Sequence, residues 1–359
     1  MGKSLMKGTE AIAEAAIQAG CKYFFGYPIT PQNEIPEYMS ARLPEVGGSY
    51  LQAESEVASI NMVMGGGAAG YRVMTTSSSP GISLMSEGIS YISMAEIPCV
   101  LVNVSRGGPG LGSILPAQGD YNQATRGGGH GDYNMIVMVP GNLQEAVDLT
   151  QDAFDLSQKY RMPAMILVDG FLGQMMEAVE ISPRKTEDPS TNAAWALGWR
   201  KERGGKHATV YSMLLTPELL EAHNTHLQEK YKRVKANEAR FEHYMVDDAE
   251  LLLTAYGTTS RVCRSAINNL RGEGYKVGMM RPITAWPFPS AGLSKLPESV
   301  KVILDVEMSA AFPMATDVRM SLTRDIPILT TGRWGGFSPT VQHVEEKCKE
   351  ILKGSVDRK

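Results

Sequence analysis

The chain has 359 residues, of which 43% are hydrophobic and 21% charged, and its net charge is −4 at pH 7. This length suits two or three domains, and the composition is that of an ordinary globular protein. The small negative charge predicts no basic face, so nucleic acid is not an expected partner. No apolar run has the length of a membrane span, and the first residues lead into no secretory segment, so no membrane association is expected.

The cysteines stand alone in the sequence, without a Cys-x-x-Cys pair. They indicate buried thiols in a reducing cytoplasm rather than disulfides, zinc ligands or an iron–sulfur site. Any redox centre is therefore expected on another chain. The four are Cys21, Cys99, Cys263 and Cys348.

From about residue 8 to 180, helical patterns alternate with short apolar runs. A helix is predicted over 9–19, ending at Gly20. The apolar runs lack strict alternation, which is typical of parallel strands covered by helices on both faces. These strands are predicted at 22–27, 71–76, 98–104, 135–139 and 164–168.

Residues 184–210 are charged and irregular, as in a linker, and Thr216-Pro217 then opens a helix predicted to continue to 244. Four apolar residues along this helix are spaced by sevens. They predict either a coiled-coil contact with another chain or an amphipathic helix packed on its own body. The four are Leu220, Leu227, Val234 and Phe241.

A second alternating region contains predicted strands at 250–256, 275–281, 301–306 and 327–330, with a helix over 259–271. The expected organisation is therefore a parallel-sheet α/β domain at 1–183, a linker with a long helix at 184–245, and a smaller α/β domain at 246–359.

Three loops follow predicted strands of the first domain, at 26–31, 77–81 and 105–112. Because the carboxyl ends of parallel strands share one edge, Thr30, Ser79 and Arg106 are expected to converge in a ligand crevice. Helix amino ends at that edge favour an anionic ligand. Taken singly, each loop is equally explained as a turn.

Gly108-x-Gly110-x-Gly112 spells part of a dinucleotide fingerprint, but Pro109 interrupts it, so an NAD-dependent dehydrogenase is disfavoured. We interpret the loop as a stretch of backbone without side chains, which lets a ligand approach Arg106.

Glu54 and Glu56 lie at the start of a predicted helix, where their side chains diverge by about 200°. Only one of them can face the crevice, and periodicity does not choose between them. Alternatively, both acids only favour the helix dipole. Among the histidines, His223 and His226 are expected on a solvated helix face, whereas His130, in a glycine-rich loop, is a candidate contact for substrate or a partner.

The loop Gly107-Gly-Pro-Gly-Leu-Gly112 and the 216–241 helix look most like the 2-oxoisovalerate (branched-chain) type of one family, the 2-oxoacid:ferredoxin oxidoreductases. Several further segments, in this order, resemble the α subunit of that family. They are Gly-Tyr-Pro-Ile-Thr-Pro at 26–31, Glu54-Ser-Glu56, Asn103-Val-Ser-Arg-Gly-Gly108 and Arg281-Pro-Ile-Thr-Ala-Trp-Pro-Phe-Pro289. The resemblance implies a thiamine-pyrimidine-binding α/β domain followed by a smaller transketolase-C-terminal-like α/β domain.

The resemblance also implies an activity, the thiamine-diphosphate-dependent oxidative decarboxylation of a 2-oxoacid to an acyl-CoA, with electrons passed to ferredoxin. By motif position, Glu56 would hydrogen-bond the aminopyrimidine ring, and Thr30 and Arg106 would hold the substrate. An arginine suits that task because its fork can bind a carboxylate bidentately. Further cofactor contacts would be Pro28, Ile29 and Ser79, and further substrate contacts Gly107 and Gly108.

In this family the diphosphate half of the site carries a Gly-Asp-Gly segment, and Val168-Asp169-Gly170 is the nearest approach to it here. The resemblance therefore implies that diphosphate and magnesium are held by a thiamine-diphosphate-binding β subunit, with further γ and ferredoxin-like iron–sulfur subunits. No metal-ligating residue is expected in this chain, which should be inactive alone.

Other functions stay open at this point. The same chemistry could act on pyruvate, 2-oxoglutarate or an aryl 2-oxoacid, and Arg126 is a spare cation for a second carboxylate. A non-redox thiamine enzyme of the transketolase type and a non-catalytic scaffold are the remaining alternatives. The segment Glu307-Met-Ser-Ala-Ala-Phe-Pro-Met314 departs from the family pattern.

Overall fold

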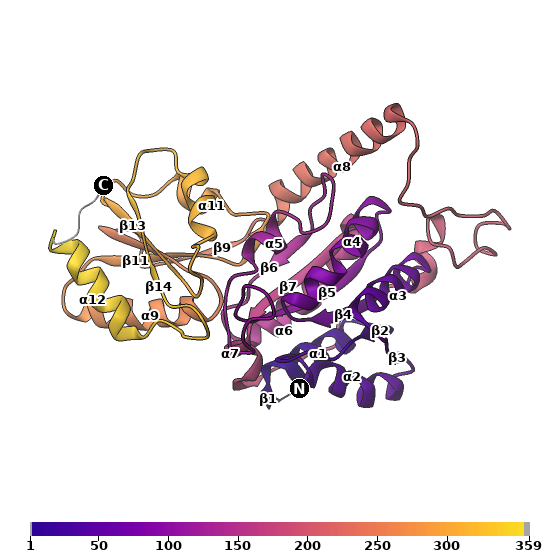
Figure 1. Ribbon diagram of the computed structural model, residues 1–359, viewed down its shortest axis with the longest axis horizontal. Coiled ribbons are helices and arrows are strands. Elements are labelled where there is room, and N and C mark those ends of the chain that lie inside the picture. The colour runs from indigo at the N-terminus through magenta and orange to yellow at the C-terminus, as the bar shows by residue number, and fades with distance from the viewer. Residues whose placement is uncertain (1, 355–359) are drawn as a thin grey trace.

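The computed structural model describes residues 2–354, whose strands form a seven-stranded, a five-stranded and a two-stranded sheet (Figure 1). This mixed, mainly parallel α/β architecture confirms the expected fold class. The elements up to residue 194 are β1 (Ser4–Lys7), α1 (Gly8–Gln18), β2 (Tyr23–Gly26), α2 (Glu34–Glu45), β3 (Ser49–Gln52), α3 (Glu56–Ala68), β4 (Val73–Ser77), α4 (Pro80–Met94), β5 (Cys99–Ser105), α5 (Tyr121–Thr125), β6 (Ile136–Met138), α6 (Leu143–Tyr160), β7 (Pro163–Asp169), α7 (Gly170–Gln174), β8 (Met176–Val179) and the 3-10 helix η1 (Pro189–Ala194).

The seven-stranded sheet has the order β12-β6-β7-β5-β4-β2-β3 and is parallel except at its edge strand β12. Every residue of β4, β5 and β7 is buried, which explains why these strands are continuous apolar runs. α1 packs against α2 and α6, and α3 packs against α4, so helices cover the sheet. α1 ends before Gly20, whose φ of 78° places it in the left-handed region.

The five-stranded sheet has the order β14-β13-β10-β11-β9 and is parallel except at β9. α9 and α12 pack together beside it and enclose a separate apolar core. The elements of this half of the chain are α8 (Pro217–Glu238), β9 (Phe241–Tyr244), β10 (Leu251–Thr254), α9 (Gly257–Gly272), β11 (Val277–Pro282), β12 (Thr284–Trp286), α10 (Ala291–Ser294), β13 (Val302–Glu307), α11 (Met314–Ser321), β14 (Ile328–Gly332) and α12 (Val341–Leu352).

The long helix α8 begins after Thr216 as predicted, but its expected end at 244 is wrong. The helix ends at Glu238, and Phe241 lies instead in β9, where the chain pairs with β11. Leu227 and Val234 are fully buried, so the C-terminal half of α8 packs on its own body.

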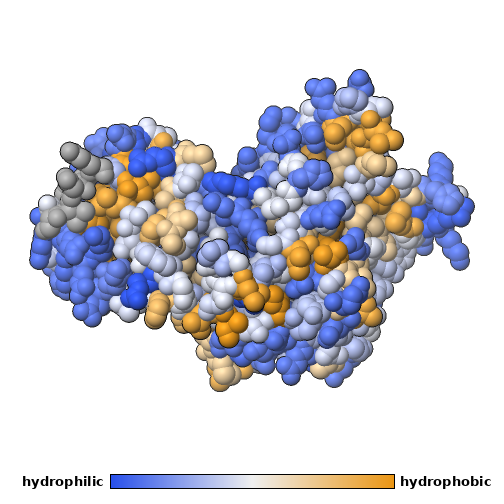
Figure 2. All heavy atoms as spheres, in the orientation of Figure 1, coloured by the Kyte–Doolittle hydropathy of each residue, from blue (hydrophilic) through white to orange (hydrophobic). Residues whose placement is uncertain are grey.

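The N-terminal half of α8 projects from the rest of the chain (Figure 1). Leu215 is 83% exposed, Leu219 56% and Leu220 39%. Figure 2 shows hydrophobic side chains gathered at the top of the view, where Figure 1 places this end of the helix. A contact of this half with another chain stays a prediction.

The two large sheets are joined by polar and backbone contacts. Thr284–Trp286 forms β12, which pairs with β6 and so completes the first sheet from the second half of the chain. Gln118 exchanges hydrogen bonds with Met308, one from its own backbone N–H and one accepted by its side chain, both at 2.9 Å. The Gln118 amide also donates to the carbonyl of Tyr256 at 2.9 Å. The loops after β10 and β13 are therefore tied to the first sheet.

All four cysteines are buried and unpaired, as predicted. Burial raises the pKa of the Cys21 and Cys348 thiols to about 12, so both stay protonated. Within residues 2–354, no helix combines the length and apolarity that a membrane span requires.

Candidate active site

Three loops meet at the carboxyl edge of the seven-stranded sheet, as the strand order predicts. Arg106 follows β5, and its guanidinium Nη1 donates to the carbonyl oxygen of Thr30, in the loop after β2, at 2.9 Å. The backbone N–H of Arg106 donates to the hydroxyl of Ser79, in the loop after β4, at 2.9 Å. The structure thus brings together Thr30, Ser79 and Arg106.

Ser79 is held in an unusual backbone conformation, with φ 22° and ψ −80°, just before α4. Such a conformation costs about 1–3 kcal/mol and persists only where the surroundings fix it. Here Ser79 donates its N–H to Asn103 at 3.1 Å and its hydroxyl to Asp120 at 2.6 Å. Asn103 also donates to Asp120, at 2.9 Å. Asp120, which the sequence did not single out, therefore fixes the loop.

A cleft of about 770 Å³ opens above these loops. Of the predicted site residues, Ser79, Arg106, Gly107 and Gly108 line it. Its opposite wall comes from the second sheet, through Met308–Ala311 after β13 and Trp334 and Gly335 after β14. No sequence pattern indicates this wall, because it depends on how the two halves of the chain pack together.

Arg106 is the single cation and Asp120 the single acid among the residues that line this cleft. The Arg106 side chain is only 6% exposed. Its Nη2 donates to the carbonyl of Leu111 at 3.1 Å, while its buried Nε finds no acceptor within residues 2–354. An orphaned donor of a buried guanidinium is costly unless a ligand accepts from it, and a carboxylate is the matching acceptor.

The glycine-rich loop after β5 is shaped partly by its own turn. Gly112 has φ 61°, and a Cβ there would lie 1.8 Å from the carbonyl oxygen of Gly107. Glycine at 112 is therefore required by the chain itself. An added Cβ at Gly108 or Gly110 would meet nothing within 4 Å, and both residues line the cleft, so this part of the loop fits the interpretation of backbone without side chains beside a ligand.

The structure distinguishes the two acids at the start of α3. Glu54 is exposed, whereas Glu56 is the first helical residue and 5% exposed. Between them, Ser55 caps the helix by accepting from the N–H of Ala58. In the described chain no side chain or N–H pairs with the Glu56 carboxylate. That carboxylate lies beside Gly81, where a Cβ would come within 2.7 Å of its Oε1.

Given the catalytic role that the sequence resemblance predicts for Glu56, Gly81→Ala is expected to lower turnover of the assembled complex by about 100-fold, the scale for misplacing a catalytic group by an ångström. The new methyl group would meet Ser77 Oγ at 2.0 Å as well as the Glu56 carboxylate, so the acid must move. Steady-state turnover checks this, with thermal unfolding measured alongside.

Gly65→Ala, within α3, is the matched control, because an added Cβ there meets nothing within 4 Å. It should leave turnover at the wild-type level. Wild-type turnover in Gly81→Ala would contradict the confinement of Glu56.

Other residues singled out from the sequence lie elsewhere. Pro28 and Ile29 precede Thr30 in its loop but do not line the cleft. Exposed His130 is also absent from the cleft lining, and its role stays a prediction. His226 lies on an exposed helix face, as expected, whereas His223 is half-buried; their rings contact the Glu96 carboxylate and the Met94 carbonyl, respectively.

Asp169, in the segment nearest to a diphosphate motif, is used structurally. Its carboxylate accepts from the N–H groups of Phe171 and Leu172 at the start of α7. It also accepts from the N–H and hydroxyl of Thr258 at the start of α9. Burial raises the pKa of this carboxyl, and the hydrogen bonds oppose that rise.

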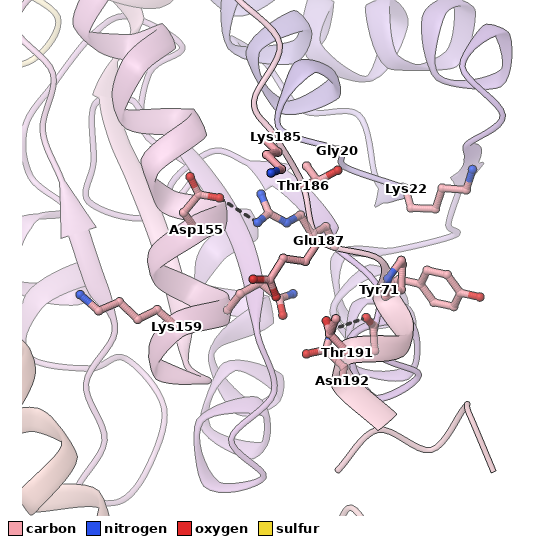
Figure 3. A pocket seen from close by; sticks show the side chains of 14 residues that line it. Gly20, Lys22, Tyr71, Asp155, Lys159, Lys185, Thr186, Glu187, Thr191 and Asn192 are labelled. Atoms are coloured by element: carbon pink, nitrogen blue, oxygen red, sulfur yellow. Dashed lines mark hydrogen bonds and ion pairs between the residues drawn. The ribbon is translucent and has the colours of Figure 1, made fainter. Parts of the chain in front are cut away.

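A second cavity, of about 630 Å³, lies at the opposite ends of the strands (Figure 3). Its lining includes Lys22 and Arg72, which directly precede β2 and β4, and part of the segment 185–192. Arg72 is already paired with Asp155 at 2.7 Å. Because the strands are parallel, this cavity does not belong to the site at their carboxyl ends.

Comparison with known proteins agrees with this geometry. Residues 14–246 match the family "Pyruvate flavodoxin/ferredoxin oxidoreductase, thiamine diP-bdg", and residues 249–344 match "Pyruvate:ferredoxin oxidoreductase core domain II". The chain therefore belongs to the family of thiamine-diphosphate-binding 2-oxoacid:ferredoxin oxidoreductases.

Two relatives illustrate the range of the family. The chain is 46% identical to "Ketoisovalerate oxidoreductase subunit VorB" of Methanothermobacter thermautotrophicus, over 99% of this chain and 100% of that protein. It is 35% identical to "2-oxoglutarate synthase subunit KorA" of Methanocaldococcus jannaschii, over 87% of this chain and 90% of that protein.

A solved structure, the 2-oxoglutarate:ferredoxin oxidoreductase of Magnetococcus marinus with 2-oxoglutarate, coenzyme A and succinyl-CoA bound, is also similar. It superposes with a TM-score of 0.85 at 29% identity and covers 98% of this chain. The present chain spans 65% of the length of that solved chain.

The surroundings of Glu56 fit the aminopyrimidine ring of thiamine diphosphate. Glu56 offers a buried carboxylate without a protein partner, and Gly81, which has no side chain, packs closely against it. The buried hydroxyls of Ser77 and Ser78 likewise have no partner within the described part of the chain. Buried polar atoms without partners are rare in proteins, and a polar ligand explains several of them at one place.

Proposed function

We propose that this chain is the pyrimidine-binding subunit of a 2-oxoacid:ferredoxin oxidoreductase that converts 2-oxoisovalerate to the corresponding acyl-CoA and passes electrons to ferredoxin. The observation that carries the proposal is the buried, unpartnered carboxylate of Glu56 beside Gly81, in a chain whose nearby cleft, lined by Ser79 and Pro80, has Arg106 as its single cation. The 46% identity to a ketoisovalerate oxidoreductase subunit supports the choice of substrate.

Glu56 would hydrogen-bond a nitrogen of the aminopyrimidine ring and hold a proton there. Its position suits this role because a carboxylate at the first turn of α3 is fixed by the helix and shielded from water. Ser79, Pro28 and Ile29 would complete the pocket around the ring. When bound, thiamine diphosphate supplies the nucleophilic carbon for the 2-oxo group and accepts the electrons released with carbon dioxide.

Arg106 and Thr30 would orient the 2-oxoacid. The Nε of Arg106 is the free donor for the substrate carboxylate, and Gly107 and Gly108 let that carboxylate approach. Ala117, Met308 and the ring of Trp334 give the same cleft an apolar lining, which suits a branched aliphatic chain.

A second substrate carboxylate would lack a partner. Arg126, the spare cation, is paired with Asp317 at 2.9 Å and does not line the cleft. The acid Asp120 would instead repel a second carboxylate. These contacts favour a monocarboxylate over 2-oxoglutarate.

A partner chain would complete the site. The apolar side chains of Leu111 and Ile114 on the loop after β5, and of Trp334 and Phe337 after β14, are more than half exposed beside the cleft. A thiamine-diphosphate-binding β subunit covering them would supply the diphosphate and magnesium contacts, since Asp169 is occupied within this chain. The γ and iron–sulfur subunits would receive the electrons.

Four unpaired thiols support a reducing, cytoplasmic location.

The assembled complex is expected to reduce a viologen dye with 2-oxoisovalerate and coenzyme A at a kcat/KM about tenfold or more above that with 2-oxoglutarate, because an unpaired buried charge costs 1–3 kcal/mol or more. Pyruvate and an aryl 2-oxoacid complete the panel. A preference for 2-oxoglutarate would overturn the substrate assignment, and no dye reduction with any 2-oxoacid would favour a non-catalytic scaffold.

A further inference from the structure

Two acids on β13 are completely buried. Asp305 and Glu307 are two residues apart on the strand, so their side chains point to the same face, and both are 0% exposed. One oxygen of each is satisfied, because Thr254 donates its hydroxyl to Asp305 Oδ1 at 2.7 Å and Met314 donates its N–H to Glu307 Oε1 at 3.0 Å. Within residues 2–354, nothing donates to the remaining oxygens, Asp305 Oδ2 and Glu307 Oε2.

Because the two side chains occupy neighbouring positions on one face of β13, the charge of one carboxyl group acts on the other. Two buried, ionised carboxylates would repel, whereas a single proton held between them turns two orphaned acceptors into a hydrogen bond. Burial raises the pKa of both acids, and the neighbouring Asp305 charge raises the pKa of Glu307 further.

The groups that face the pair from neighbouring elements do not compete for this proton. They are the phenols of Tyr256 after β10 and Tyr121 on α5, and the thiol of Cys263 on α9. Burial raises the pKa of each well above its usual value, so all three are neutral at physiological pH.

The pair lies on the strand that leads directly into the opposite wall of the cleft. Glu307 directly precedes Met308–Ala311, and it pairs in register with Gly332, just before Trp334. Its Oε1 also holds the first N–H of α11. From α11, Asp317 accepts a hydrogen bond from Tyr121 at 2.7 Å and pairs with Arg126. A change at Glu307 therefore reaches both loops of that wall and a contact between the two sheets.

We propose that Asp305 and Glu307 share one proton, and that this proton positions the wall formed by residues 308–311 and 334–335 opposite Arg106, so that they act as positioning residues for substrate binding. The role in substrate binding rests on the proposed function, but the shared proton does not. Loss of the proton places a second negative charge in an enclosed site. The two carboxylates then repel each other, and residues 308–311 and 334–335 are no longer held in position.

Infrared spectroscopy of the full chain tests the proton directly. At neutral pH the wild-type protein should show the carbonyl stretching band of a protonated carboxylic acid, and the difference spectrum against Glu307→Gln should contain that band. Asp325→Asn is the control, because Asp325 is fully exposed and should contribute no such band. A wild-type spectrum identical to that of Glu307→Gln in this region would overturn the proposal, whatever the enzyme's substrate is.

The Michaelis constant tests the consequence in the assembled complex. With the best 2-oxoacid, KM should rise roughly tenfold for each pH unit above the pKa of the pair, because only the fraction that keeps the proton retains the binding wall. The effect on kcat should be smaller. In Glu307→Gln the amide donates permanently to Asp305, so the KM profile of this variant should be flat. Parallel profiles in the two proteins, or an equal loss of kcat and kcat/KM, would exclude the positioning role.

Discussion

Replacing Glu56 by glutamine is expected to leave the complex assembled and to lower its turnover by about 10²–10⁴-fold, the usual contribution of a positioned proton-transfer group. Glutamine has the same shape and stays buried behind Gly81, but it cannot hold and return a proton at the pyrimidine ring. The measurement is dye-linked turnover, with size-exclusion chromatography to verify assembly.

Glu54→Gln is the matched control. Glu54 lies two residues earlier and is exposed, so its replacement should leave turnover at the wild-type level. Turnover of Glu56→Gln close to that of wild type would remove Glu56 from its assigned role. A loss in both variants would point instead to the helix dipole or to subunit assembly.

Arg106→Lys is expected to lower kcat/KM for the 2-oxoacid by about 100-fold, mainly through KM, since hydrogen bonds to charged groups contribute about 1.5–3 kcal/mol and tenfold is about 1.4 kcal/mol. Lysine keeps the positive charge. Its single ammonium group, however, cannot donate at the same time to the carbonyls of Thr30 and Leu111 and to a substrate carboxylate. Substrate-dependent turnover of the assembled complex gives both constants.

Arg126→Lys serves as the comparison for this variant, because it preserves a charge beside Asp317 and lies outside the cleft. It should change KM by less than about twofold, because lysine keeps an ion pair with Asp317 and Arg126 is not among the residues that line the cleft. If Arg126→Lys raised KM as much as Arg106→Lys, the assignment of Arg106 as the single substrate cation would fail.

The central strands of the seven-stranded sheet could be predicted from the sequence, whereas its edge strands could not. β5 and β7 are buried throughout, and burial on both faces leaves a continuous apolar run that identifies a strand. β3 is short and mostly exposed, so it carries no such signal. β12 was missed for another reason, because its three residues become a strand only by pairing with β6, far away in the chain.

The same distinction applies to the site. Thr30, Ser79 and Arg106 could be predicted because each follows a strand, and parallel strands end at one edge. The choice between Glu54 and Glu56 required the position of the helix cap at Ser55, which periodicity does not fix. The 308–311 wall could not be predicted, since it reaches the cleft only through contacts between the two sheets.

The crossover of β12 affects how this gene can evolve. A break of the reading frame in the segment before α8 would separate β12 from β6, and the earlier fragment would display a bare strand edge open to aggregation. The two halves of this polypeptide share one sheet, so a division between them would leave that sheet incomplete in the earlier fragment.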